Sequence, residues 1–158
     1  MKAIAVVGVL VTLWFRVSEA GDALTPEQVP MRSEIAWGAE GASRCEAMAW
    51  STEDYSSCID RAVAHAMNSG RASMPFQLGI YCSAFFRLAQ AYSSERWKQS
   101  RIDLDNAKVA AVDEYDSCTF SARSLGLNSD QICTTLALSC DVFDQALHQW
   151  RDISRSGM

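Results

Sequence analysis

The sequence predicts an all-α fold: a small antiparallel four-helix bundle, stapled by disulfides and preceded by a loose N-terminal arm. Three observations support this prediction. Apolar residues recur at steps of three and four through most of the chain after residue 43, which is the period of an amphipathic helix. Short turn signals separate these stretches, as in bundles whose neighbouring helices are antiparallel. The chain also contains six cysteines, an even number that favours disulfides.

The first twenty residues have the pattern of a secretory signal peptide. Lys2 supplies a positive charge, the run from Ala3 to Phe15 is apolar or small, and Ser18 and Ala20 place small side chains where signal peptidase requires them. A spanning helix needs about 20 apolar residues, and Arg16 ends the run before that length. We therefore expect cleavage after Ala20, no stable membrane anchor, and a secreted or periplasmic protein.

Three segments follow from this pattern: a signal peptide at 1–20, an irregular N-terminal arm at 21–42 and a helical bundle domain at 43–158. The arm contains Pro26 and Pro30 together with several glycines, and it has no sustained period. When the two basic residues and one acidic residue of the signal peptide are subtracted, 12 Lys and Arg remain against 18 Asp and Glu, a formal charge of −6. Nucleic acid is therefore not expected as a partner.

The first of the four expected helices begins at Ser43 and ends at Asn68-Ser69-Gly70. Ser43-Arg44-Cys45-Glu46 matches a capping box, in which the first and last side chains accept hydrogen bonds from backbone donors at a helix start. The glycine provides the usual helix stop. A break inside this helix stays open as an alternative, because Ser51-Thr52-Glu53-Asp54 is itself a cap sequence.

The other three helices are bounded by similar signals. The second is expected from near Pro75 to about Tyr92, and the third, which begins after Ser94, ends at a Schellman-type stop formed by Gly126-Leu127. The fourth is capped by Asn128, Ser129 or Asp130 and continues through Trp150, with the clearest amphipathic period in the chain.

The cysteines predict up to three disulfides in an oxidising compartment. Two of them, Cys133 and Cys140, would lie about 10.5 Å apart on one helix, beyond the roughly 7 Å limit for a bridge, so we expect each to pair elsewhere. No two cysteines are closer than seven residues, which disfavours a zinc site. The six disulfide residues are Cys45, Cys58, Cys82, Cys118, Cys133 and Cys140.

One bridge is predicted from hairpin symmetry. Residues equidistant from the turn of an antiparallel hairpin face each other, and Cys118 and Cys140 each lie 11 positions from residue 129. We therefore predict that Cys118 pairs with Cys140.

The remaining four cysteines leave two schemes open. In one scheme Cys58 pairs with Cys82, and Cys45 is left with Cys133 near the opposite end of the bundle. In the other, Cys45 pairs with Cys58 and Cys82 pairs with Cys133, which requires the first helix to break near Ser51.

No catalytic motif is present. The sequence lacks the G-x-S-x-G elbow of serine hydrolases, the C-x-x-C-H haem box and the E-x-x-H pair of di-iron bundles. The acidic residues Asp113, Glu114 and Asp116 are expected to form a solvated helical face. We therefore name no catalytic, metal-binding or cofactor-binding residue, expect no cofactor, and favour a non-enzymatic protein. An enzyme that uses His65 or His148 stays as the last alternative.

The first functional hypothesis is an exported protein that binds another extracytoplasmic protein, in an inhibitor-like or immunity-like role. Trp37, in the expected arm, is its candidate interface residue, because tryptophan often anchors interfaces. The alternative is a carrier of a small apolar ligand in a groove between helices. That groove would be lined by four aromatic residues, Tyr81, Phe85, Phe86 and Tyr92.

Overall fold

The computed structural model describes residues 24–26, 28, 31–94 and 101–157, so the expected signal peptide lies outside the described residues. In this part the chain forms helices and no strand, and three disulfides join them. The predicted all-α bundle is therefore confirmed. Its helices are α1 (Arg32–Met48), α2 (Thr52–Asn68), α3 (Met74–Ser94), α4 (Arg101–Leu125), α5 (Ser129–Thr135) and α6 (Cys140–Arg155).

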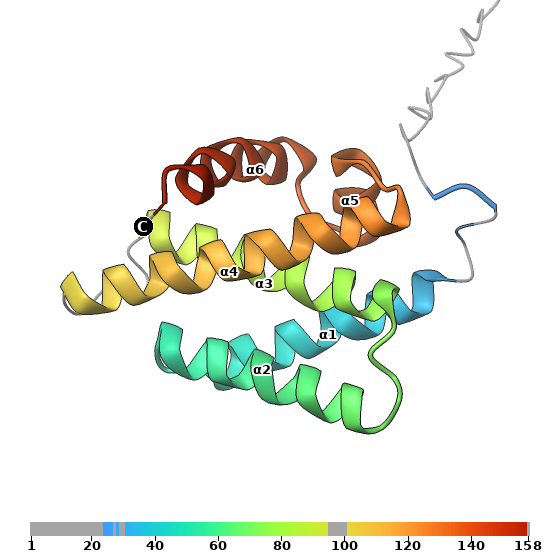
Figure 1. Ribbon diagram of the computed structural model, residues 1–158, viewed down its shortest axis with the longest axis horizontal. Coiled ribbons are helices and arrows are strands. Elements are labelled where there is room, and N and C mark those ends of the chain that lie inside the picture. Colours follow the sequence, from blue (N-terminus) through green and yellow to red (C-terminus); the bar gives the residue numbers. More distant parts are fainter. Residues whose placement is uncertain (1–23, 27, 29–30, 95–100, 158) are drawn as a thin grey trace, which may run out of the picture.

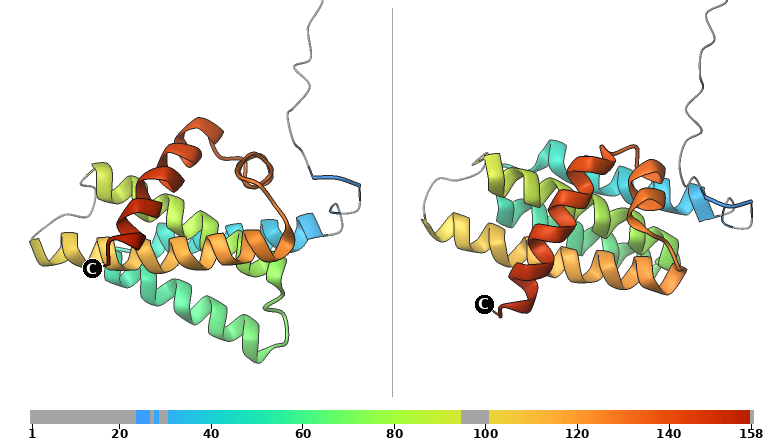
Figure 2. Two further views of the ribbon diagram at one scale, coloured as in Figure 1. Left: turned by 45° about the horizontal axis from the view of Figure 1, so that its top comes forward. Right: turned by 90° about the horizontal axis from the view of Figure 1, so that it is seen from above.

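Helices α1 to α4 form the body of the bundle. Helices α1 and α3 run in one direction and α2 and α4 in the other (Figure 1). Helix α2 lies on one side of the α3–α4 pair, and α5 and α6 lie on the other side. Helix α6 crosses over this pair at a steep angle (Figure 2).

Helices α1 and α3 approach each other closely where two glycines meet. A Cβ atom on Gly38 would lie 2.2 Å from the carbonyl oxygen of Phe76, and one on Gly79 would lie 2.0 Å from the carbonyl oxygen of Ile35. No real Cβ atom fits at such distances, so only glycine allows the two backbones to touch here.

The expected irregular arm is wrong over residues 32–42, because this segment forms most of α1. Glycines such as Gly38 are typical of loops, so the sequence alone predicted an irregular segment. Here Gly38 lies within α1 and allows that helix to pack closely on α3. Ser43 consequently lies inside α1 and does not cap a helix. Its hydroxyl oxygen accepts a hydrogen bond of 2.9 Å from the Arg87 guanidinium.

The first expected helix is divided at Ser51, so the single helix from Ser43 to Asn68 is wrong and the alternative with a break is confirmed. The Ser51 hydroxyl accepts a hydrogen bond of 3.1 Å from the backbone N–H of Asp54, which caps α2. The apolar period continues across the break at Ser51, because residues on both sides of it face the same core. The period therefore predicted one continuous helix.

The helix stops follow the predicted chemistry in two places. Gly70 and Gly126 adopt positive φ values of 68° and 66°. The N–H of Leu127 donates to the carbonyl of Ala122 at 3.0 Å, and that of Gly126 donates to Arg123 at 3.2 Å. This is the Schellman pattern, and the predicted stop at Gly126-Leu127 is confirmed.

The expected fourth helix is also divided, into α5 and α6. Asn128 starts α5 with a full capping box, which the sequence had offered among three candidates. The helix ends where Ala137 adopts a φ of 54° and Leu138 donates to the carbonyl of Cys133 at 2.8 Å. This is a Schellman stop in which alanine takes the position that glycine usually occupies. Because no glycine marks the stop in the sequence, the expected continuous helix through Trp150 was wrong.

The predicted Cys118–Cys140 bridge is wrong. Cys118 pairs with Cys82, across a Cα–Cα distance of 4.6 Å. The bridge therefore joins α4 to the antiparallel α3 and not to α6.

The other two pairs correct the open schemes. Cys133 pairs with Cys140 at a Cα–Cα distance of 5.1 Å, because the chain leaves the helix between them. Cys45 pairs with Cys58 at 5.6 Å across the corner at Ser51, as the second scheme expected.

We expect Gly38→Ala to destabilise the protein by about 3 kcal/mol or more, because its methyl group meets the backbone of α3. Gly41→Ala is the matched control on the same helix, since its added Cβ would lie 3.5 Å from Ile80 Cδ1, an ordinary contact. This control should be neutral or stabilising by about 1 kcal/mol. Urea denaturation followed by circular dichroism measures both, and equal effects would contradict the close approach.

Removal of the disulfides should cost stability in the order of the loops that they close. Replacing Cys82 and Cys118 together by alanine opens a separation of 36 residues and should cost about 4 kcal/mol, whereas the Cys133 and Cys140 pair, at a separation of 7, should cost about 2 kcal/mol. Non-reducing peptide mapping of the wild-type protein checks the pairing, and denaturation of the double variants checks the order.

Candidate functional site

An exposed apolar corner joins α1 to α2. Trp50 has 87% of its surface exposed and Met48 has 64%, although both are large apolar side chains. Exposed apolar side chains of this size cost little singly, but a tryptophan beside a second apolar residue is typical of a contact surface. We call Met48, Trp50 and the cavity beside them the Trp50 corner.

The backbone of the Trp50 corner is fixed from both sides. The Cys45–Cys58 disulfide ties the last turn of α1 to the second turn of α2. The N–H of Ala49 still donates to the Cys45 carbonyl at 3.0 Å, and Ser51 caps the next helix. The indole is therefore presented on a rigid turn, which reduces the conformational entropy lost when a partner binds.

A cavity of about 250 Å³ lies beside the indole. Cys45, Ala49 and Cys58 contribute to its lining, together with Met48 and Trp50. Two exposed residues of opposite charge, Asp54 and Arg61, also line it. A projecting ring next to a small hollow, with charged groups around it, matches the anatomy of an interface with an apolar centre and a polar rim.

Trp37, the residue predicted for an interface, occupies a different setting from the one expected. It lies on α1 and is half-buried, and its ring packs on Phe76 with 4.5 Å between centroids. Trp50 is the more exposed indole. Its position directly before the cap at Ser51 was the available signal, because a residue next to a helix break is turned away from the helix contacts.

The four aromatic residues of the expected apolar groove contribute mainly to packing. Phe85 is fully buried, with ring centroids 5.4 Å from Tyr115 and 6.4 Å from Trp150, and Tyr92 lies edge-on to Trp150 at 5.3 Å. Phe86 is the one of the four that lines a cavity of about 540 Å³ between α3 and α6. Glutamines also line that cavity, so it is not uniformly apolar.

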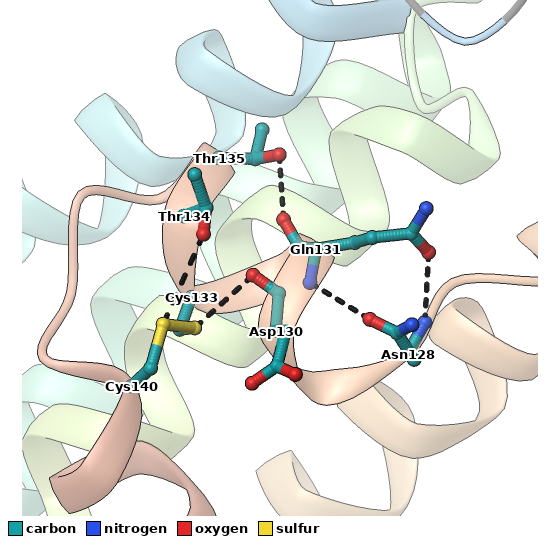
Figure 3. Close-up of a disulfide and its surroundings, with 7 residues drawn as sticks. All are labelled: Asn128, Asp130, Gln131, Cys133, Thr134, Thr135 and Cys140. Atoms are coloured by element: carbon teal, nitrogen blue, oxygen red, sulfur yellow. Dashed lines mark hydrogen bonds between the residues drawn. A yellow bond between two sulfur atoms is a disulfide. The ribbon is translucent and has the colours of Figure 1, made fainter. Parts of the chain in front are cut away.

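The Cys133–Cys140 disulfide lies beside an acidic residue (Figure 3). A carboxylate oxygen of Asp130 and the two sulfur atoms lie within 4.8 Å of one another. Thiolates bind metals, but both sulfurs are used by the disulfide and carry no charge. The Thr134 hydroxyl, 3.9 Å from the Cys140 sulfur, completes this polar environment at the start of α6.

The two histidines lie on different helices, His65 on α2 and His148 on α6. The His148 Nε2 atom is 3.4 Å from the Asp144 carboxylate one turn earlier, and both side chains are more than half exposed. This is a contact between residues four positions apart, of the kind found along solvated helices.

Glu114 is buried, so the expectation that it forms surface charge is wrong. Only 6% of its surface is exposed. Burial, followed by the nearby carboxylates of Asp60 and Asp113, raises the pKa of Glu114 to about 8. The signal was helix phase, because Glu114 follows Ala111 by three positions and precedes Cys118 by four, on the buried stripe of α4.

No protein-family model, no curated protein and no solved structure matches this chain. Within the described ranges, every helix is too short or too polar to cross a membrane. Function is therefore inferred from the geometry above and from the three disulfides, which are typical of an oxidising, extracytoplasmic environment.

We expect the stability of the protein to fall as pH rises. Glu114 keeps its proton to a pKa of about 8 when folded but loses it near 4.5 when unfolded, so the unfolded state binds fewer protons between these values. The free energy of unfolding should drop by about 3 kcal/mol from pH 5.5 to pH 8. Denaturant titrations at a series of pH values measure this drop.

Glu114→Gln should remove most of this dependence, and Glu40→Gln, on the exposed surface of α1, should keep it. An unchanged pH profile in Glu114→Gln would show that another group causes the loss.

Proposed function

We propose that this chain is an exported, non-enzymatic protein that binds another protein in the periplasm or outside the cell through the Trp50 corner. The observation that carries the proposal is the 87% exposed indole on a turn fixed by the Cys45–Cys58 disulfide. An inhibitor-like or immunity-like role fits such a rigid binding surface.

The physical argument concerns the distribution of binding energy in interfaces. A small number of residues supply most of it, tryptophan is the most enriched among them, and they sit in or beside pockets that become dry on binding. The Trp50 corner offers both parts, a ring that projects and a hollow of about 250 Å³ that receives a side chain. The charges of Asp54 and Arg61 then restrict the choice of partner, because mismatched charges at the rim are repelled.

Affinity capture from the envelope or culture fluid of the source organism tests the proposal. Tagged oxidised protein, crosslinked and analysed by mass spectrometry, should recover one stoichiometric partner. Trp50→Ala should weaken binding of that partner by about 2 kcal/mol or more, roughly thirtyfold, while its stability changes by less than about 0.5 kcal/mol.

Phe120→Ala is the matched control, since Phe120 is an aromatic residue 60% exposed on α4 and away from the corner. It should bind as the wild type does. Equal capture by Trp50→Ala and wild type would refute the role of the corner. A dimer of this chain that Trp50→Ala dissociates, with no other protein recovered, would refute a heterologous partner.

A further inference from the structure

A second cavity, of about 360 Å³, lies between α2 and α4 and is strongly acidic. Four carboxylates line it, Glu53 and Asp60 from α2 and Asp113 and Glu114 from α4. No residue lines both this cavity and the one at the Trp50 corner. The acidic cavity therefore calls for an explanation of its own.

Two residues that line this cavity each carry a buried polar atom with no hydrogen-bond partner among the described residues. These atoms are the Oε2 atom of Glu114, a residue with 6% of its surface exposed, and the hydroxyl of Ser56. A buried polar atom without a hydrogen-bond partner costs free energy, and native structures rarely retain one. These atoms point to a ligand that brings N–H donors and positive charge.

The charges are spread along the cavity and are not gathered at one point. Helices α2 and α4 run in the same direction (Figure 1), and the lining extends over residues 52–60 of α2 and 106–114 of α4, or about 12 Å of each helix. Asp60, Asp113 and Glu114 act on one another electrostatically and so share one end. Glu53 lies seven residues before Asp60, toward the other end.

The residues that line the cavity indicate which class of cation it binds. Val109 and Ala110 line the cavity between its ends and offer an apolar surface to methylene groups. Among the described residues the lining includes no aromatic ring, so a quaternary ammonium group would find no face there on which to stack. A primary ammonium, a compact charge with three donors, suits carboxylates and a hydroxyl.

A preformed metal site is the competing explanation. Metal ligands converge within a few ångströms of one another, but among the described residues these carboxylates do not form a group whose oxygens all lie within 4.8 Å. The separation of the charges along the cavity suits a longer cation better.

We propose that the cavity between α2 and α4 binds a linear aliphatic polyamine. One terminal ammonium lies between Asp60, Asp113 and Glu114, where it supplies the missing donors, and a second ammonium lies toward Glu53. The methylene chain between them packs on Val109 and Ala110.

Binding is coupled to proton release. An ammonium beside Glu114 favours its ionised form, and the free protein holds a proton there because burial and then Asp60 and Asp113 raise its pKa. The other titratable groups near it are two phenols, Tyr55 on α2 and Tyr81 on α3, whose pKa values are raised by burial and then by Glu114, so they stay protonated. Affinity should therefore increase from about pH 6 to about pH 8, as far as the amines stay charged.

Isothermal titration of the oxidised protein with spermidine tests the proposal. We expect one site per chain, and repetition in buffers of different ionisation enthalpy should show proton release near neutral pH. Glu114→Gln should weaken binding by about tenfold or more and abolish the proton release. Glu40→Gln removes the same charge from the exposed surface of α1 and should leave both unchanged.

Three outcomes would overturn the proposal. If the wild-type protein does not bind spermidine, the proposed site does not exist. If Glu114→Gln and Glu40→Gln weaken spermidine binding equally, the protein attracts spermidine only through its overall charge. Tighter binding of Ca²⁺ or Mg²⁺, displacing spermidine, shows a metal site instead. A monoamine of matched length, such as hexylamine, should bind at least about tenfold more weakly than spermidine, and equal binding would refute recognition at both ends. Loss of the Trp50 interaction has no bearing on these results, because the two cavities share no residue.

Discussion

The contact between the backbones of α1 and α3 determines how the rest of the bundle is built. With Gly38 and Gly79 facing each other, the two helices pack at a distance that side chains would not permit. The large side chains of α3 are then free to pack on α4 and α6, where Phe85 meets rings from both helices. Helix α2 is connected to this framework through the corner after α1, and its position relative to α4 leaves the acidic cavity open.

Local signals in the sequence predicted some helix ends, such as the stop at Gly126, but the expected cap at Ser43 was wrong and the stop at Ala137 was missed. The Gly126 stop and the cap at Ser51 depend on a few neighbouring atoms. Such local chemistry can be predicted from the sequence without knowledge of the tertiary fold. The glycines of α1 were misjudged because glycine favours loops when exposed and helix contacts when buried, and only the partner helix decides between these uses. The symmetry rule gave the wrong bridge for Cys118, because the helix that it assumed through Cys133 and Cys140 is divided between these two residues.

The candidate site residues show the same distinction. The exposure of Trp50 is a consequence of the break at Ser51, and a continuous helix does not predict it. Glu114 lies on a buried stripe that the apolar period already marked, yet its charge argued for solvent. In both cases a residue departs from the pattern of its own helix. Such departures lower stability or expose apolar surface, and they are characteristic of sites retained for binding.

Both candidate sites use α2, on different faces. Its first turns carry the cap, the disulfide and the residues around Trp50, and they also contribute Glu53 and Ser56 to the acidic cavity. A helix of 17 residues that is fixed near its start by a covalent bridge is a suitable support for both surfaces.

The order of the disulfides has a consequence for how the chain matures. Each bridge joins cysteines that are consecutive in the sequence, Cys45 with Cys58, Cys82 with Cys118 and Cys133 with Cys140. A chain that enters an oxidising compartment from its N-terminus, and whose thiols are oxidised in the order in which they emerge, forms these pairs directly. Disulfides formed in this order need an oxidase but no isomerase to reshuffle mispaired cysteines.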